Sequence, residues 1–181
     1  CEMITQTGSD HIGDMICDFL RKNGVSDEFV CRHPNTKSHI TLAFLNEHND
    51  AQYEFYKDHA RDLLDIPLPQ ITSDDIVLFG SFFAINPIIR SVTRKLITEA
   101  HKAGAWLYYD VNFRKNHIAE LPAILPNIEE NMRLASVVRG SMEDFDYLFG
   151  LQNADTIYNR VRSLCTTLIL TDGARSIRVY T

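Results

Sequence analysis

The segment that most constrains the fold lies in the middle of the chain, from Ala105 to Arg114. Its apolar part, residues 106–109, follows a glycine and stops at Asp110, so its length and aromatic content predict a buried β-strand. Asn112 and Arg114 then follow at alternate positions. In open α/β sheets, ligands bind outside the carboxyl ends of the strands. The segment therefore predicts a carboxylate, an amide and a guanidinium at a ligand-binding edge. The alternative is an Asp110–Arg114 ion pair that only fixes a loop.

The flanking segments alternate between strand and helix patterns with short connections. Asn86 followed by Pro87 predicts a helix start, with an N-cap and a proline in the first helical position. A β-α-β order with short joints implies parallel strands and right-handed crossovers. We therefore expect an α/β fold, a three-layer, Rossmann-like, mostly parallel sheet with flanking helices. The predicted strands around the central one are residues 75–79, 135–138, 167–170 and 176–180.

Residues 38–45 and 51–56 predict a β-hairpin inserted among these units, with a turn at 47–50. Two strands alone are only marginally stable, so an apolar face of the hairpin needs cover. A partner subunit, a substrate pocket or ordinary packing on the main sheet would each provide it. The apolar residues that alternate along the two strands are Ile40, Leu42 and Phe44 on the first, and Tyr53 and Phe55 on the second.

Near the start of the chain, Asp10 is a plausible N-cap of a helix. The segment from Gly8 to Gly13 has the spacing of a phosphate loop, but it lacks the lysine that pairs with phosphate, so a Walker A loop is rejected. The helical spacing predicts that one apolar stripe faces a core. That stripe consists of Ile12, Met15, Ile16, Phe19 and Leu20.

Composition excludes several classes of protein. The 181 residues carry a net charge of −6, which argues against a nucleic-acid partner. No apolar run is long enough to predict a membrane span. The four cysteines are widely spaced and form no C-x-x-C, so we expect reduced thiols in a cytoplasmic protein. A single domain, residues 1–181, is the default at this length, with residues 36–58 as an inserted β lid.

Two further segments offer oxygen ligands near strand ends. Ser141 precedes a predicted helix whose first turns are acidic, and Asp144 lies there. Such residues either cap the helix and complement its dipole, or belong to a magnesium site. Thr171 and Gly173 lie at the exit of a strand, where a hydroxyl and unhindered amides could bind phosphate. The same residues are equally typical of a plain tight turn.

Taken in chain order, these stretches resemble the ribokinase-like (PfkB) family of carbohydrate kinases, and fructokinase-like members in particular. The resemblance is collinear and covers nearly the whole chain. The segments that carry it are Thr7-Gly-Ser-Asp-His-Ile-Gly13, the hairpin, Asp110-Val-Asn-Phe-Arg114 as the family's D-x-N-x-R, Val137 to Gly150 as its N-x-x-E segment, and Thr171-Asp-Gly173 as its T-x-G.

The resemblance implies transfer of the γ-phosphoryl group of ATP to a hydroxymethyl of a small sugar such as fructose, with Mg²⁺ as the metal. It implies that the hairpin is a lid over the sugar and the contact of a homodimer. The implied substrate-binding residues are Asp110, Asn112, Arg114, Tyr53 and Phe55. The implied nucleotide-side residues are Ser141, Asp144, Thr171 and Gly173, with Asp144 associated with the metal.

The sequence also departs from the family pattern. Ser141 takes the place of the family's asparagine and Asp144 that of its glutamate, although both keep oxygen ligands. The family's glycine-rich substrate motif would lie before Cys1, and its G-A-G-D, with the catalytic aspartate base, after Thr181. We therefore expect a central portion of a kinase that is inactive alone. The rival interpretation is a non-catalytic ligand-binding or dimerisation module on the same fold.

Overall fold

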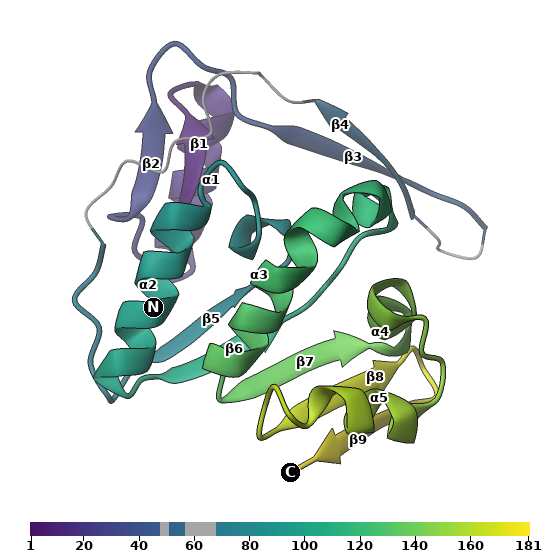
Figure 1. Ribbon diagram of the computed structural model, residues 1–181. Helices are drawn as coiled ribbons and strands as arrows, with labels where there is room; N and C mark the ends of the chain where they lie inside the picture. The colour runs from purple at the N-terminus through teal and green to yellow at the C-terminus, as the bar shows by residue number, and fades with distance from the viewer. Residues whose placement is uncertain (48–50, 57–67) are drawn as a thin grey trace. The chain divides into compact units, whose positions relative to one another are not determined.

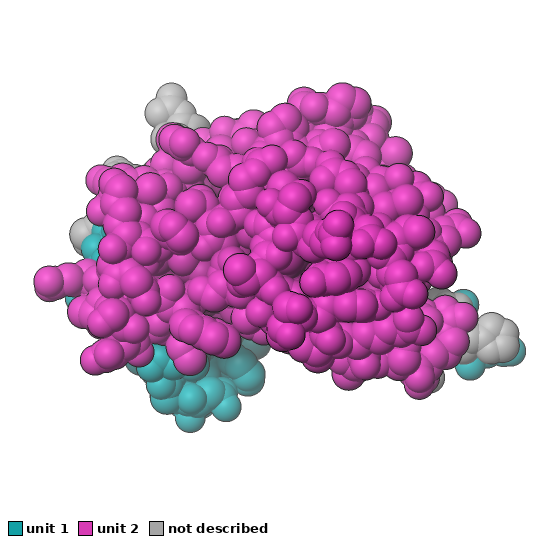
Figure 2. All heavy atoms as spheres, turned by 60° about the horizontal axis from the view of Figure 1, so that its bottom comes forward, with its two compact units in different colours: residues 1–69 teal, residues 70–181 magenta. Residues whose placement is uncertain are grey.

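The computed structural model describes residues 1–47, 51–56 and 68–181. The chain forms two compact units, residues 1–69 and residues 70–181, which Figure 2 colours teal and magenta. Parts of two predicted segments lie outside the described residues, namely 48–50 of the hairpin turn and 57–58 of the lid. Among the described residues, no helix is both long enough and apolar enough to cross a membrane.

Unit 1 begins with a β-α-β motif. Its two strands, β1 (Thr5–Gly8) and β2 (Val30–His33), precede and follow α1 (His11–Lys22) in the sequence and pair with each other in parallel. Asp10 caps α1 as predicted, because its Oδ1 accepts a hydrogen bond from Gly13 N at 2.9 Å. This cap satisfies one of the backbone donors that every helix leaves free at its start.

The predicted apolar stripe of α1 is partly wrong. Met15 is 55% exposed and Phe19 is 67% exposed. The buried residues are Gly13, Cys17 and Leu20, which recur every three or four positions and so share one face. The helix therefore presents a narrower face, centred on the thiol of Cys17 and packed on β2, than the sequence pattern predicts.

The predicted hairpin is confirmed, with β3 (Ile40–Leu45) antiparallel to β4 (Ala51–Tyr56). Leu42 pairs with Glu54, and Ala43 pairs with Tyr53. Because directly paired residues lie on the same face of a sheet, the apolar side chains fall into two sets on opposite faces. One set is Ile40, Leu42, Phe44 and Tyr56, and the other is Leu45, Tyr53 and Phe55; all are exposed.

Unit 2 contains a five-stranded sheet with the order β5-β6-β7-β8-β9 (Figure 1). The first four strands are parallel and β9 is antiparallel to β8. The α/β class with a mostly parallel sheet and flanking helices is thus confirmed. The strands are β5 (Ile76–Gly80), β6 (Trp106–Asp110), β7 (Val137–Ser141), β8 (Leu168–Asp172) and β9 (Ser176–Tyr180).

Four α-helices and two 3₁₀ turns of unit 2 connect these strands. Along β6, Leu107 and Tyr109 are buried whereas Trp106 is 57% exposed, so the main core lies on one face of the sheet. The connecting elements are η1 (Phe82–Ala84), α2 (Arg90–Ala103), η2 (Lys115–Glu120), α3 (Leu121–Leu134), α4 (Met142–Phe149) and α5 (Ala154–Val161).

The predicted start of the second helix is wrong. Asn86 is not its N-cap, because α2 begins at Arg90. Asn86 Oδ1 instead accepts a hydrogen bond from Ile88 N at 3.0 Å, which closes a local turn two residues long. The guanidinium of Arg90 donates a hydrogen bond to Ala84 O, which precedes this turn in the sequence, at 2.7 Å. This hydrogen bond connects the first residue of α2 to the last residue of η1.

Candidate active site at the carboxyl ends of β6, β7 and β8

Three predicted site residues lie at the carboxyl ends of adjacent parallel strands. Asp110 is the last residue of β6 and is paired with Arg139 of β7. Ser141 is the last residue of β7 and is paired with Thr171 of β8. Because parallel strands bring their carboxyl ends to one edge of the sheet, the structure places these polar side chains along the edge that the sequence predicted.

A hollow of about 900 Å³ lies at the β7–β8 part of this edge. Predicted residues Ser141, Thr171 and Gly173 line it. Its charged lining includes the cations Arg139 and Arg175 and the acids Glu143, Asp146 and Asp172. A concave site with a few convergent polar groups is typical of ligand binding.

Arg139 is the residue of this site that the sequence analysis missed. Its Nη1 lies 3.0 Å from Asp110 Oδ1, and its Nη2 donates to Thr171 Oγ1 at 3.1 Å. One half-buried guanidinium thus connects the ends of β6 and β8 across β7. A signal was present in the sequence, because Arg139 lies two residues before Ser141 and strand alternation puts both on one face.

The alternative of an Asp110–Arg114 ion pair is wrong, since Asp110 pairs with Arg139 instead. Arg114 is exposed and lies just before η2, where its backbone O accepts a hydrogen bond from His117 N at 2.9 Å. Its guanidinium makes no hydrogen bond or ion pair with the described part of the chain. It therefore stays available as a predicted phosphate or substrate contact.

Asn112, the amide of the predicted motif, lies in a strained backbone segment. Its φ is 38°, and Ser81 at the end of β5 has a φ of 52°. The two are joined, because Ser81 Oγ donates to Asn112 O at 3.2 Å, and Ser81 N donates to Asp110 O at 3.0 Å. Non-glycine residues rarely adopt such angles, and they cluster at functional sites. The strain therefore supports a functional assignment of this loop.

Asp144 is 5% exposed, and both of its carboxylate oxygens accept hydrogen bonds from the protein. It forms a capping box with Ser141 at the start of α4, so the capping alternative is confirmed. No group of three or more His, Cys, Asp or Glu side chains in the described ranges is arranged to hold a metal ion. The association of Asp144 with magnesium stays a prediction.

Thr171 lies near the end of β8, and Gly173 lies in the tight turn between β8 and β9. Gly173 has a φ of 51°, which favours glycine, and Arg175 N donates to Asp172 O at 2.9 Å. The plain-turn alternative is therefore correct for the backbone. The turn also borders the hollow, so a phosphate role for its hydroxyl and amides stays a prediction.

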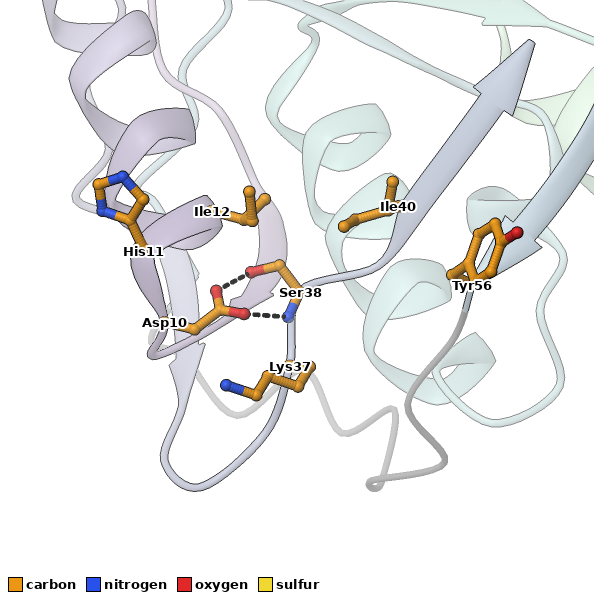
Figure 3. A pocket seen from close by; sticks show the side chains of 7 residues that line it. All are labelled: Asp10, His11, Ile12, Lys37, Ser38, Ile40 and Tyr56. Atoms are coloured by element: carbon orange, nitrogen blue, oxygen red, sulfur yellow. Dashed lines mark hydrogen bonds between the residues drawn. The ribbon is translucent and has the colours of Figure 1, made fainter. Parts of the chain in front are cut away.

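Unit 1 has a separate hollow of about 570 Å³, between the start of α1 and the root of the hairpin (Figure 3). Asp10 Oδ1 accepts from Ser38 Oγ at 2.6 Å and its Oδ2 accepts from Ser38 N at 3.0 Å. The hydrogen bond from the Ser38 hydroxyl, followed by those from the amides of Gly13 and Ser38, lowers the pKa of Asp10 to about 2. The role of Tyr53 and Phe55 as substrate-binding residues of the lid stays a prediction.

The whole chain, residues 1–181, matches the family model of the pfkB family carbohydrate kinases. The chain belongs to this family. The predicted resemblance to this family is therefore confirmed.

Relatives and solved structures agree with this assignment. Probable fructokinase-5 of Arabidopsis thaliana is 26% identical over 184 residues, which cover 98% of this chain and 57% of the relative. A fructokinase of Vibrio cholerae, solved with fructose, ADP and calcium, superposes with a TM-score of 0.86 at 20% identity over 99% of this chain and 59% of its own. A Xylella fastidiosa fructokinase with bound ATP gives 0.75 at 24% identity, with coverage of 99% and 59%. The chain thus spans a little over half the length of its relatives.

Proposed function

We propose that the protein carrying this pfkB chain is an ATP-dependent sugar kinase, which transfers the γ-phosphoryl group to a hydroxymethyl of a small sugar such as fructose. The observation that carries the proposal is the row of Asp110, Arg139, Ser141 and Thr171 along one edge of a parallel sheet, beside a hollow large enough for a ligand. Phosphoryl transfer needs mainly positioning and charge stabilisation, which such a row of side chains can supply.

In this proposal the two ends of the row have different roles. Asp110, Asn112 and Arg114 face the sugar and the transferred group, while Ser141, Thr171 and Gly173 bind the nucleotide. The hollow has two cations and several hydrogen-bond donors, which suit polyphosphate oxygens. The catalytic base is expected outside residues 1–181, so the chain by itself is proposed to be inactive.

Mg²⁺ fits this donor set as a metal that arrives with the nucleotide. Magnesium is usually bound by one or two carboxylates, substrate phosphates and several waters, and not by an all-protein cage. Glu143 and Asp146 line the hollow with carboxylates, and Ser141 adds a hydroxyl. When bound, the metal would neutralise charge on the phosphates, and Glu143, Asp146 and Ser141 would hold it through its water ligands.

The hairpin is proposed as the lid and as a dimer contact. Its two exposed apolar faces support two uses, because each face would need cover. We assign the face with Tyr53 and Phe55 to the sugar and the face with Ile40, Leu42 and Phe44 to a second copy. Replacement of Phe44 by serine should then shift a dimer toward monomer in light scattering, while Phe55→Ser raises KM for the sugar.

The free thiols and the acidic charge agree with a cytoplasmic protein without nucleic-acid or membrane partners.

A phosphorylation assay tests the function. The complete protein and the 181-residue chain are each incubated with Mg·ATP and a panel of sugars, and ADP release is followed. We expect the complete protein to phosphorylate fructose in preference to ribose, and the shorter chain to be inactive. Thr171→Val should raise KM for ATP, whereas Thr166→Val, an exposed change before β8, should not.

No turnover of any sugar by a complete protein would reject the kinase and favour the rival, a ligand-binding or dimerisation module. Two observations give that rival a basis, namely the family asparagine and glutamate replaced by Ser141 and Asp144, and the engagement of both Asp144 oxygens. Nucleotide binding without turnover, measured by calorimetry, would then support the module.

A further inference from the structure

The carboxylate of Asp144 lies between two backbone segments that are far apart in the sequence. Its Oδ1 accepts a hydrogen bond from Phe113 N at 2.7 Å, across 31 residues. Its Oδ2 accepts from Ser141 N at 2.6 Å and from Ser141 Oγ at 2.8 Å. The side chain thus joins the loop after β6 to the turn between β7 and α4.

The loop that Asp144 contacts is the one with the strained amide residue. Asn112 has its φ of 38° directly before Phe113. Val111 and Phe113 on either side are buried, at 2% and 6% exposure. A left-handed conformation of a non-glycine residue persists only where its surroundings fix it. Such fixing contacts are therefore required on both sides of Asn112.

Three hydrogen bonds supply these contacts. Val111 N donates to Arg139 O at 2.9 Å, and Ser81 Oγ donates to Asn112 O at 3.2 Å. The bond from Phe113 N to Asp144 is the third, and it is the one that uses a charged and buried acceptor. Hydrogen bonds to charged groups are stronger than neutral ones, and a buried amide left without an acceptor is costly.

We infer that Asp144 is a positioning residue, which holds the backbone at Phe113 and so presents Asn112 and Asp110 to the substrate. The inference rests on the proposed function for its catalytic consequence, but its structural part does not. It assigns Asp144 a role through Phe113 N–H, in place of direct contact with a metal.

The surroundings of Asp144 explain why a carboxylate is needed. In the described part of the chain, the hydrogen-bond partners of its two oxygens are all donors, namely Phe113 N, Ser141 N and the Ser141 hydroxyl. An asparagine has one oxygen and one NH₂ group, so its NH₂ would face a backbone N–H on one side. Asp144→Asn should therefore break one of the two backbone connections while changing the volume very little.

Amide hydrogen exchange measured by NMR on the full chain tests the structural part. We expect Asp144→Asn to speed amide exchange at Phe113 or Ser141 about tenfold or more. The amide that loses its hydrogen bond to residue 144 opens to solvent more easily. The matched control is Asp146→Asn, two residues away, whose carboxylate accepts from the exposed Gln152 side chain. The control should leave both amides unchanged.

A second variant covers the case in which Asp144→Asn does not fold. Asp144→Glu keeps the charge and both oxygens, but its extra methylene cannot keep both backbone bonds at their lengths in a site this buried. Exchange at one of the two amides should again be faster. Unchanged exchange at both Phe113 and Ser141, in whichever variant folds, would overturn the inference.

Kinetics of the complete protein separate positioning from metal binding. If Asp144 acts through Phe113, Asp144→Asn lowers kcat and raises KM for the sugar, while half-saturation by Mg²⁺ stays within about twofold of the parent protein. Restoration of activity by a higher Mg²⁺ concentration would overturn the inference. An inactive parent protein would count against the proposed kinase alone, because the exchange result does not depend on turnover.

Discussion

Arg139 Nη1 lies 3.0 Å from Asp110 Oδ1, and the two residues are paired on adjacent parallel strands. The same guanidinium reaches Thr171, so one side chain connects the acid on the proposed sugar side with the hydroxyl on the proposed nucleotide side. A planar guanidinium suits this arrangement, because its N–H groups point in fixed directions. The arrangement makes Arg139 the first residue to test.

Arg139→Met should lower the activity of the complete protein roughly tenfold or more, since Asp110 and Thr171 lose their common donor. The free energy of unfolding should fall by only about 1 kcal/mol or less, because both charges of the pair are partly exposed to water. Arg133→Met is the control, since Arg133 is 54% exposed, pairs with Glu129 on its own helix and does not line the hollow. Equal kinetic effects of the two changes would contradict a special role for Arg139.

Arg90 and Arg94 allow a buried and an exposed ion pair to be compared on the same acid, Glu130. Burial raises the pKa of Glu130, but the hydrogen bonds from Arg94 and Arg90 outweigh it, so that the pKa is lowered overall. The Arg90 side chain is 10% exposed and also donates to Asn131 Oδ1 and Ala84 O, whereas Arg94 is 61% exposed. Arg90→Met should lower the free energy of unfolding, measured with urea, by about 3–5 kcal/mol. Arg94→Met should cost less than about 1 kcal/mol. Similar costs would show that the cluster is not held by Arg90.

Gly80 is required by the close approach of β5 to β6. A Cβ atom on Gly80 would clash with the backbone oxygen of Asp110, which cannot give way as a flexible side chain can. Gly80→Ala should therefore displace the end of β6 and destabilise the protein by about 3 kcal/mol or more. Gly150→Ala, where a Cβ meets open space but φ is 67°, should cost about 1–2 kcal/mol. Thermal unfolding of both variants checks the order, and a milder effect at Gly80 would refute the argument.

The root of the hairpin should weaken in acid because of Asp10. Its pKa in the folded protein is about 2, below its ordinary value of 3.8, so the folded state favours the ionised form. The stabilisation is present above the ordinary value and is lost as the pH falls through the folded value. The melting temperature should therefore decline between about pH 4 and pH 2 more steeply in the parent protein than in Asp10→Asn. Parallel pH profiles would exclude this contribution.

Much of the fold could be predicted from local sequence. The central strand, the hairpin, the Asp10 cap and the capping box at Ser141 all follow from residues within a few positions of each other. The positions of Asp110 and Ser141 at strand ends could be predicted for the same reason, because these polar residues directly follow apolar runs. Two predictions, the start of α2 and the stripe of α1, were wrong, because tertiary packing can override a local pattern. At the start of α2, Arg90 donates a hydrogen bond to Asn131 Oδ1, 41 residues along the chain.

The sequence by itself determined most of the strands and helices, and that Asp110 ends a buried strand, because hydrophobic period and capping are local properties. Only the tertiary structure decided that Asp110 pairs with Arg139 and not with Arg114, and that Asp144 binds the amide of Phe113. Those partners are set by strand register and by the meeting of loops far apart in the chain. Register depends on how whole faces are buried together, which no short stretch of residues encodes.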